Sequence, residues 1–122
     1  MSNKNDYNKK LKRTSDLLDN KLKYEIIYFL LQREMRFGEL KENLNTITQQ
    51  LLTKLLRQLE NHNLITRKQY NGFPRKVEYR LTAFGRSLKP VINSLLRWEE
   101  QNSIKINNQL KKKKPDSLYD YF

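Results

Sequence analysis

Six polar side chains between residues 48 and 57 are of the types that bind the base edges and phosphates of DNA. They are Thr48, Gln49, Gln50, Thr53, Lys54 and Arg57. Gln can bond bidentately to adenine, Lys can bond to guanine, and Thr can contact the methyl group of thymine. Thr48 and Arg57, at the two ends of the set, are better suited to holding phosphates. This set is therefore a candidate surface for reading a DNA groove.

The same polar side chains lie at helical spacing opposite an apolar stripe. The stripe has Leu51 at its edge and consists of Leu52, Leu55, Leu56 and Leu59. This period predicts an amphipathic helix that Thr46 or Thr48 can cap and that ends near Asn61–Asn63. An ordinary solvated face is the usual interpretation of polar residues on one isolated helix. We favour DNA contact because a basic hairpin follows this helix.

Residues 65–81 predict that hairpin. Strands are expected at 65–70 and 77–81, and the turn at 71–74 is rich in Asn, Gly and Pro. Arg75 and Lys76 follow the turn, so we expect them to touch the minor groove or its phosphates. The alternative is a turn that its charge keeps soluble. Phe73 either packs under the turn or reaches the DNA. In the second strand, period two places Val77, Tyr79 and Leu81 inward, and Glu78 and Arg80 outward.

The positive charge of the chain is concentrated near the helix and the hairpin. The 122 residues carry a formal net charge of +12 at pH 7, which favours a polyanionic partner. A gene rich in A and T would also supply many lysines. However, residues 14–53 have five basic and six acidic side chains, whereas residues 54–80 have seven basic and two acidic ones. A groove-facing surface explains this asymmetry and base composition does not.

Other helices and strands must hold the polar helix and the basic hairpin in place. Residues 1–12 are polar without periodicity and predict a solvated arm. An apolar stripe between Leu18 and Leu30 predicts a first helix from Asp16 to about Gln32. A short edge strand is expected at 35–37, and Leu40 and Leu44 mark a brief second helix.

A last long helix is expected to begin at Thr82, which can cap it. Its apolar positions step by four and three residues, as in a heptad seam that Pro90 would kink. They are Phe84, Leu88, Val91, Leu95 and Trp98. The first two are expected in the core, but Leu95 and Trp98 lie too far along to be covered, so we expect a homodimer interface there. The first helix offers a matching surface, made of Leu17, Tyr24 and Tyr28.

Composition excludes several kinds of chemistry. The chain has no cysteine and only one histidine, His62, so neither a thiolate metal site nor a histidine-based triad is expected. Without a Gly-rich loop either, we expect no enzyme activity and no cofactor. No apolar run approaches the length of a membrane span, and residues 1–12 lack the apolar segment of a secretory signal. We therefore expect no membrane contact and a cytoplasmic, nucleoid-associated location.

A chain of this length is expected to form one domain. We divide it into a flexible basic arm at 1–13, a DNA-binding and dimerisation domain at 14–110 and a basic C-terminal tail at 111–122. The Lys111–Lys114 run in that tail is most simply a disordered segment, and it can also add non-specific affinity for DNA.

Three blocks of this sequence resemble a known family. The first is Arg36-Phe37-Gly38-Glu39-Leu40, and the second combines Thr48-Gln49, Leu52-Thr53, Leu56-Arg57 and Leu59-Glu60. The third combines Pro74-Arg75-Lys76-Val77-Glu78-Tyr79, Leu81-Thr82 and Gly85-Arg86-Ser87-Leu88. In this order and at these separations, residues 14–100 resemble the HxlR family of bacterial winged-helix transcription regulators.

The resemblance implies a mainly α-helical fold with a small β-hairpin, that is, a winged helix-turn-helix with extra N- and C-terminal dimerisation helices. It also implies a homodimer on a two-fold symmetric operator in double-stranded DNA. The recognition helices would enter successive major grooves, and the wings would touch the flanking minor groove or phosphates. The terminal helices of the two subunits would contact each other.

The sequence departs from the family pattern at one point. Many members carry a cysteine near the start of the first helix and sense oxidants with it, but Lys10 to Leu18 contains none. This chain resembles a cysteine-free member, and its effector is unknown. The alternative function is a winged-helix module that binds protein or RNA. RNA binding has little support, since Tyr70 and Phe73 are the only aromatic residues near the hairpin tip.

Overall fold

The computed structural model describes residues 4–74 and 76–113, which belong to two compact units divided after Lys89. The helices of the first unit are α1 (Lys4–Leu17), α2 (Lys21–Gln32), α3 (Phe37–Leu44), α4 (Gln49–Asn61) and α5 (Ala83–Arg86). Its strands are β1 (Met35–Arg36), β2 (Ile65–Tyr70) and β3 (Lys76–Leu81), and α6 begins at its border and spans Lys89–Lys113. The fold is mainly α-helical with a small antiparallel sheet, as predicted.

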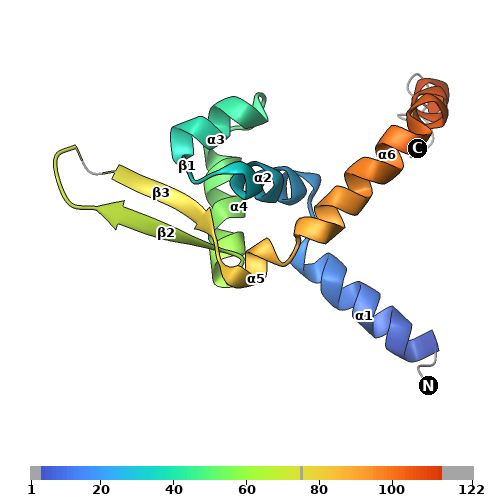
Figure 1. The fold of residues 1–122 in the computed structure, drawn as a ribbon, viewed down its shortest axis with the longest axis horizontal. Helices are drawn as coiled ribbons and strands as arrows, with labels where there is room; N and C mark the ends of the chain where they lie inside the picture. The colour runs from blue at the N-terminus through green and yellow to red at the C-terminus, as the bar shows by residue number, and fades with distance from the viewer. Residues whose placement is uncertain (1–3, 75, 114–122) are drawn as a thin grey trace. The chain divides into compact units, whose positions relative to one another are not determined.

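The core of the first unit lies where α2, α3 and α4 meet the sheet. α2 contacts both α3 and α4, and each of the three helices also contacts at least one strand (Figure 1). The fully covered apolar side chains are all aliphatic: Ile26, Ile27, Leu30, Leu40, Leu52, Leu56, Leu59 and Leu64. Burying them removes apolar surface from water, which is the main favourable term in folding. The helix that carries the candidate polar face is thereby held rigidly.

The first predicted helix is two helices. Residues 18–20 interrupt it, and Asn20 Oδ1 accepts a hydrogen bond from the backbone N–H of Leu22 at 2.8 Å, which caps α2. The irregular arm predicted for residues 1–12 is also wrong, because α1 begins at Lys4. Its described side chains are exposed up to Asp16, so the arm is solvated but helical. The predicted end of the helix at Gln32 is confirmed.

One charged side chain is buried in this unit. Lys23 of α2 is 1% exposed, and its Nζ donates to Asp19 Oδ1 at 2.7 Å. This partner holds the pKa of Asp19 below its usual value, since both the hydrogen bond and the positive charge favour the carboxylate. The ion pair explains how a lysine is accommodated at a buried position.

The brief second helix and the edge strand are confirmed as α3 and β1. Glu39 Oε1 accepts from the backbone N–H of Arg36 at 3.1 Å and so satisfies a donor at the start of α3. The helix ends at Asn45, whose φ of 65° is tolerated best by Asn and Gly. β1 pairs with β3, so the sheet order is β1-β3-β2.

The hairpin is confirmed, with pairing from Ile65 opposite Leu81 to Tyr70 opposite Lys76. The predicted alternation of β3 is not seen, however. Only Leu81 is buried, and the four residues before it, Glu78 and Arg80 included, are all half-buried. β3 is the central strand: β2 pairs along its whole length on one edge, and β1 pairs with Glu78 and Tyr79 on the other. We refer to β2, β3 and the turn at 71–74 as the wing.

The start of α5, which follows the wing in the chain, contacts the residues just after α4. Thr82 caps α5 as predicted, since its Oγ1 accepts from the Gly85 N–H at 3.0 Å. The same hydroxyl donates to the Asn63 carbonyl oxygen at 2.6 Å. A side chain on Gly85 would collide with the Leu64 carbonyl oxygen, so only glycine allows this close approach.

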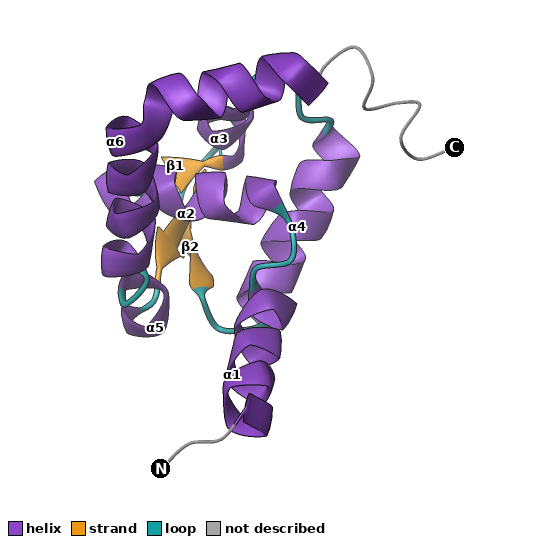
Figure 2. Ribbon diagram, turned by 90° about the vertical axis from the view of Figure 1, so that its right-hand side faces the viewer, coloured by secondary structure: helices purple, strands orange, loops and turns teal. Residues whose placement is uncertain are grey.

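The second unit consists of α6 in its described part. The predicted single helix from Thr82 through Pro90 is wrong, because α5 ends at Arg86 and α6 starts anew at Lys89. Pro90 is the second residue of α6, where its missing N–H costs nothing. The bend lies instead at Asn102, where φ is −124° (Figure 2). Phe84 is 51% exposed, so its predicted place in the core is wrong, whereas Leu88 is half-buried.

Much of the apolar surface of α6 is exposed to solvent. Ile92 is 4% exposed, but Leu95 and Trp98 are 50% and 60% exposed. Of the Lys111–Lys114 run, the first three residues continue the helix and Lys114 lies outside the described residues. None of the helices in the described ranges combines the length and apolarity that a membrane span requires.

Candidate nucleic-acid interface

The polar face of α4 is exposed as the sequence predicts. Thr48 caps the helix, with its Oγ1 accepting from the Leu51 N–H at 3.1 Å. Gln49 and Gln50 follow in the first turn and are exposed, and Lys54 is exposed one turn later. The opposite face is anchored by four buried leucines. The helix therefore presents rigidly held hydrogen-bonding groups at its N-terminal end.

Thr53 has a more restricted role than its type suggests. It is half-buried, and its Oγ1 donates to the Gln49 carbonyl oxygen at 2.8 Å. The hydroxyl proton is therefore already used within the helix. What remains for a ligand is the methyl group and a lone pair of the oxygen. Such a side chain can contact a thymine methyl without donating a hydrogen bond.

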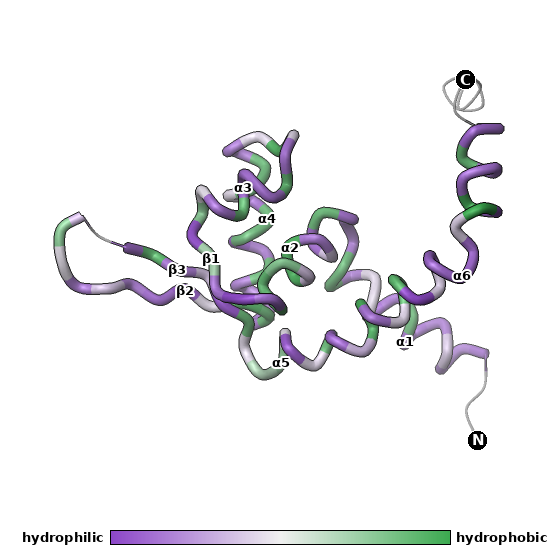
Figure 3. The backbone as a smooth tube through the Cα atoms, turned by 45° about the horizontal axis from the view of Figure 1, so that its top comes forward, coloured by the Kyte–Doolittle hydropathy of each residue, from purple (hydrophilic) through white to green (hydrophobic). Residues whose placement is uncertain are grey.

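The wing carries polar side chains along both strands. Figure 3 shows the hydrophilic colouring of β2 over most of its length. Lys76 is exposed at the start of β3, whereas Arg75 lies outside the described residues. Phe73 is 101% exposed, so the interpretation in which it packs under the turn is wrong.

A pocket of about 320 Å³ lies between α4 and the wing. Thr53 and Arg57 line this pocket from α4, and Arg67 of β2 and Tyr79 of β3 line it from the wing. Arg67 Nε lies 3.2 Å from Glu60 Oε2, which ties the wing to the helix. The sequence showed that Arg67 adds positive charge, but it did not predict that Arg67 and Arg57 line the same pocket. No pattern in the sequence reports a contact between residues of different elements.

Burial raises the pKa of Tyr79, and the nearby carboxylate of Glu60 adds to the effect. The phenol is therefore protonated at neutral pH and can donate a hydrogen bond into this pocket. With Arg57 and Arg67, the pocket offers two guanidinium groups and one hydroxyl around a single carboxylate. This set of groups suits a phosphate better than a base edge.

The basic side chains differ in whether a carboxylate neutralises them. Arg80 and Arg67 form ion pairs with Glu34 and Glu60. In the described ranges, no ion pair involves Lys54, Arg57, Lys68 or Lys76. Lys68 lies over the ring of Tyr70, with its Nζ 4.9 Å from the ring centroid. Of these four cations, Lys54 and Arg57 belong to α4 and Lys68 and Lys76 belong to the wing.

The residues predicted for a dimer interface are only partly covered. Leu17 and Tyr24 are half-buried, and Tyr28 is 37% exposed. On α6, the exposed apolar surface includes a shallow pocket lined by Pro90, Val91, Ser94 and Leu95. The predicted interface residues of the first unit and those of α6 are therefore each at least partly exposed to solvent.

Comparison with known proteins places this arrangement among regulators of transcription. The sequence model of HxlR-like helix-turn-helix proteins matches residues 17–107. The HTH-type transcriptional regulator YkvN of Bacillus subtilis, itself uncharacterised, is 42% identical over 85 residues, which are 70% of this chain and 72% of YkvN.

Two solved structures are similar in fold. The redox regulator HypR in its reduced form has a TM-score of 0.76 and 35% identity, covering 80% of this chain and 97% of HypR. The reduced transcriptional regulator YodB of B. subtilis has a TM-score of 0.68 and 28% identity, covering 83% of this chain and 94% of YodB.

Proposed function

Since this chain belongs to the HxlR-like helix-turn-helix family of transcription regulators, we propose that it is a homodimer that binds a two-fold symmetric DNA operator. The family consists of DNA-binding regulators and is not a class of enzymes. This assignment also favours a cytoplasmic protein that acts at the nucleoid. What remains to be assigned is the role of each element.

The recognition helix in this proposal is α4. Its N-terminal end carries the exposed Gln49, Gln50 and Lys54, which supply base contacts in the major groove. Thr53 adds an apolar contact through its methyl group. Thr48 and Arg57 hold the flanking phosphates. The observation that carries the proposal is this exposed polar face, held beside cations that form no ion pair within the described residues.

The wing reaches the flanking minor groove or its phosphates. Lys76 supplies an exposed, unpaired cation at the start of β3, and Arg75, outside the described residues, precedes it in the sequence. A cation at a wing tip contributes affinity that is largely independent of sequence. The wing therefore strengthens binding, whereas α4 selects the site.

The homodimer uses accessible apolar side chains of α1, α2 and α6. Leu95 and Trp98 of α6 form one surface, and the half-buried Leu17 of α1 forms the other with Tyr24 and Tyr28 of α2. A patch of this kind on a small chain is usually covered by a partner. Two-fold symmetry would place two copies of α4 about 34–36 Å apart, one turn of B-DNA.

The test is to select duplexes from a randomised pool with the full chain and then to footprint the selected sequence in the promoter upstream of the gene. We expect inverted half-sites whose centres are one helical turn apart. Gln50→Ala should lose the selected sequence, while Gln101→Ala on exposed α6 serves as the matched control. Recovery of no preferred sequence, or of one unpaired half-site, would contradict the proposal.

A further inference from the structure

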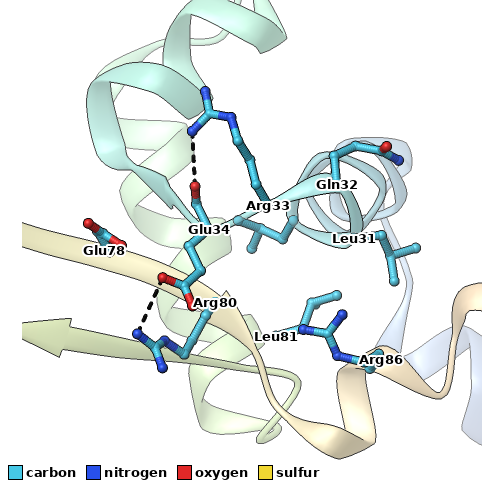
Figure 4. Close-up of a pocket in the computed structure, with 9 residues that line it drawn as sticks. Leu31, Gln32, Arg33, Glu34, Glu78, Arg80, Leu81 and Arg86 are labelled. Atoms are coloured by element: carbon cyan, nitrogen blue, oxygen red, sulfur yellow. Dashed lines mark hydrogen bonds and ion pairs between the residues drawn. The ribbon is translucent and has the colours of Figure 1, made fainter.

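A second pocket lies at the base of the wing, and none of its lining residues belongs to α4. Its volume is about 440 Å³. It is bounded by the last turn of α2, the link between α2 and β1, the inner end of β3, and α5 (Figure 4). Three arginines from three of these segments line it, namely Arg33, Arg80 and Arg86.

Three charged side chains of this pocket, Arg33, Glu34 and Arg80, already take part in ion pairs. Arg33 Nη2 lies 2.6 Å from Glu39 Oε2, outside the pocket, and Arg33 Nη1 donates to the Glu34 carbonyl oxygen at 3.0 Å. The Arg33 guanidinium holds the pKa of Glu39 below its usual value, as expected for a tight pair. Glu34 Oε2 in turn accepts from Arg80 Nη2 at 3.3 Å.

The other carboxylate of the pocket is also balanced. Glu78 Oε2 accepts from the Tyr70 hydroxyl at 3.4 Å. On the neighbouring strands Glu78 stands opposite Arg36 and Lys68, so two cations flank it across the sheet. Neither glutamate therefore leaves the pocket with an unopposed negative charge.

Two donor groups remain without an acceptor. Arg80 Nε is buried and has no hydrogen-bond partner among the described residues. The Arg86 side chain forms no ion pair or side-chain hydrogen bond within the described part of the chain. Figure 4 shows Arg80 and Arg86 on either side of Leu81. A buried donor without an acceptor is unfavourable, so an acceptor from outside the chain is expected here.

The pocket also has apolar walls. Leu31 lines it from α2, and Leu81, which is 5% exposed, lines it from β3. We propose that this pocket binds a small carboxylate with a short apolar body. The carboxylate accepts hydrogen bonds from the Arg86 guanidinium and, when the Arg80 side chain turns its buried Nε toward the pocket, from Arg80 as well, and the apolar body lies against Leu31 and Leu81. This site is separate from the DNA contacts proposed above and does not depend on them.

Sodium hexanoate is the probe, titrated into the full chain at constant ionic strength and followed by proton–nitrogen and methyl correlation spectra. We expect saturable shifts of the Arg80 and Arg86 Nε–H signals and of the Leu31 and Leu81 methyl signals. Acetate supplies the charge without the apolar body, and inorganic phosphate supplies a different anion. Both should bind about tenfold more weakly than hexanoate, because neither contacts the leucines.

The decisive variant is Arg86→Gln. Because the Arg86 side chain has no described partner, this change should leave the fold intact. It should weaken hexanoate binding by about tenfold, the size expected for a lost charge-assisted hydrogen bond. Arg13→Gln on exposed α1 is the matched control, with the same change of charge and no expected effect.

Three results would overturn the proposal. One is a shift that grows linearly with hexanoate and does not saturate. Another is equal binding by the Arg86→Gln and Arg13→Gln chains, which would make the effect one of net charge. The third is acetate or phosphate binding as tightly as hexanoate, which would remove the apolar recognition.

Discussion

The two amphipathic helices α4 and α6 expose opposite faces. On α4 the apolar stripe is covered, with Leu52 and Leu59 both 0% exposed, and the polar face is open. On α6 Ile92 is buried, but several other large apolar side chains are open, with Leu95 at 50% and Trp98 at 60% exposed. An exposed polar face suits a hydrated, charged partner, whereas an exposed apolar face suits another apolar surface. The comparison suggests that α4 serves DNA and that α6 serves a second copy of the chain.

The largest expected effect is that of salt. Affinity for duplex DNA should fall with a slope of log affinity against log salt of about −4 to −8, since a dimer neutralises several phosphates. This corresponds to a loss of roughly 10²- to 10⁵-fold between about 50 and about 200 mM salt. The dimer itself should not weaken over this range, because apolar contacts are not screened. Filter binding and sedimentation measure the two quantities, and a slope near zero would remove the DNA assignment.

The next largest effect is on stability. Leu59→Ala in α4 should lower the free energy of unfolding by about 2–5 kcal/mol, since it leaves a cavity in the core. Leu110→Ala in α6, where the side chain is 61% exposed, should change it by only about 0.5 kcal/mol. Denaturant titration by circular dichroism measures both changes. Equal losses would show that the apolar surface of α6 is covered after all.

A double substitution should separate dimerisation from folding. Leu95→Ala combined with Trp98→Ala should give a folded or partly folded monomer. Its affinity for the operator should fall by about 10²-fold, because the second half-site no longer binds intramolecularly. Binding to random DNA should persist. Light scattering measures the mass, with Glu100→Ala as the control.

Two results would contradict this assignment. A double variant that remains dimeric would place the interface elsewhere. A wild-type chain that is monomeric at about micromolar concentration would remove the argument, since an obligate dimer assembles in that range.

Within α4 and the wing, base contacts should be separable from phosphate contacts. Gln50→Ala should reduce discrimination between operator and random duplex by about 1–3 kcal/mol. Thr53→Ala should act in the same direction, whereas Thr53→Val, which keeps a methyl group, should retain most of the discrimination. Lys76→Ala should weaken both DNAs together, as should Arg75→Ala. Competition binding measures these ratios, and the reverse pattern would mean that the helix and the wing exchange roles.

The smallest expected effect is that of oxidants. Diamide or hydrogen peroxide should leave operator binding unchanged at doses that inactivate thiol sensors, since the chain has no cysteine. Met35 is 4% exposed, which slows its oxidation further. Gel shifts before and after treatment, with and without a thiol reductant, provide the measurement. A rapid loss of binding that thiols reverse would be inconsistent with this sequence.

Local patterns predicted the elements that local physics controls. The leucine period of α4, its Thr48 cap and the turn at 71–74 were all correct, because each depends on residues within one or two turns. The predictions were wrong where an apolar pattern continued across the end of a helix. The apolar stripe that begins at Leu18 did not show that residues 18–20 separate α1 from α2, and the apolar positions from Phe84 to Trp98 did not show that α5 and α6 are separate helices.

The sequence by itself determined the helix-turn-helix and wing, the excess of positive charge in residues 54–80 and the absence of thiol chemistry, since composition and short-range periodicity encode these properties. Only the tertiary structure decided which polar side chains already have a hydrogen-bond or ion-pair partner within the chain. It paired Arg80 with Glu34 and Arg67 with Glu60, directed the Thr53 hydroxyl to its own helix and left Arg80 Nε without an acceptor. These outcomes depend on contacts between distant residues, and the linear pattern of a chain does not record them.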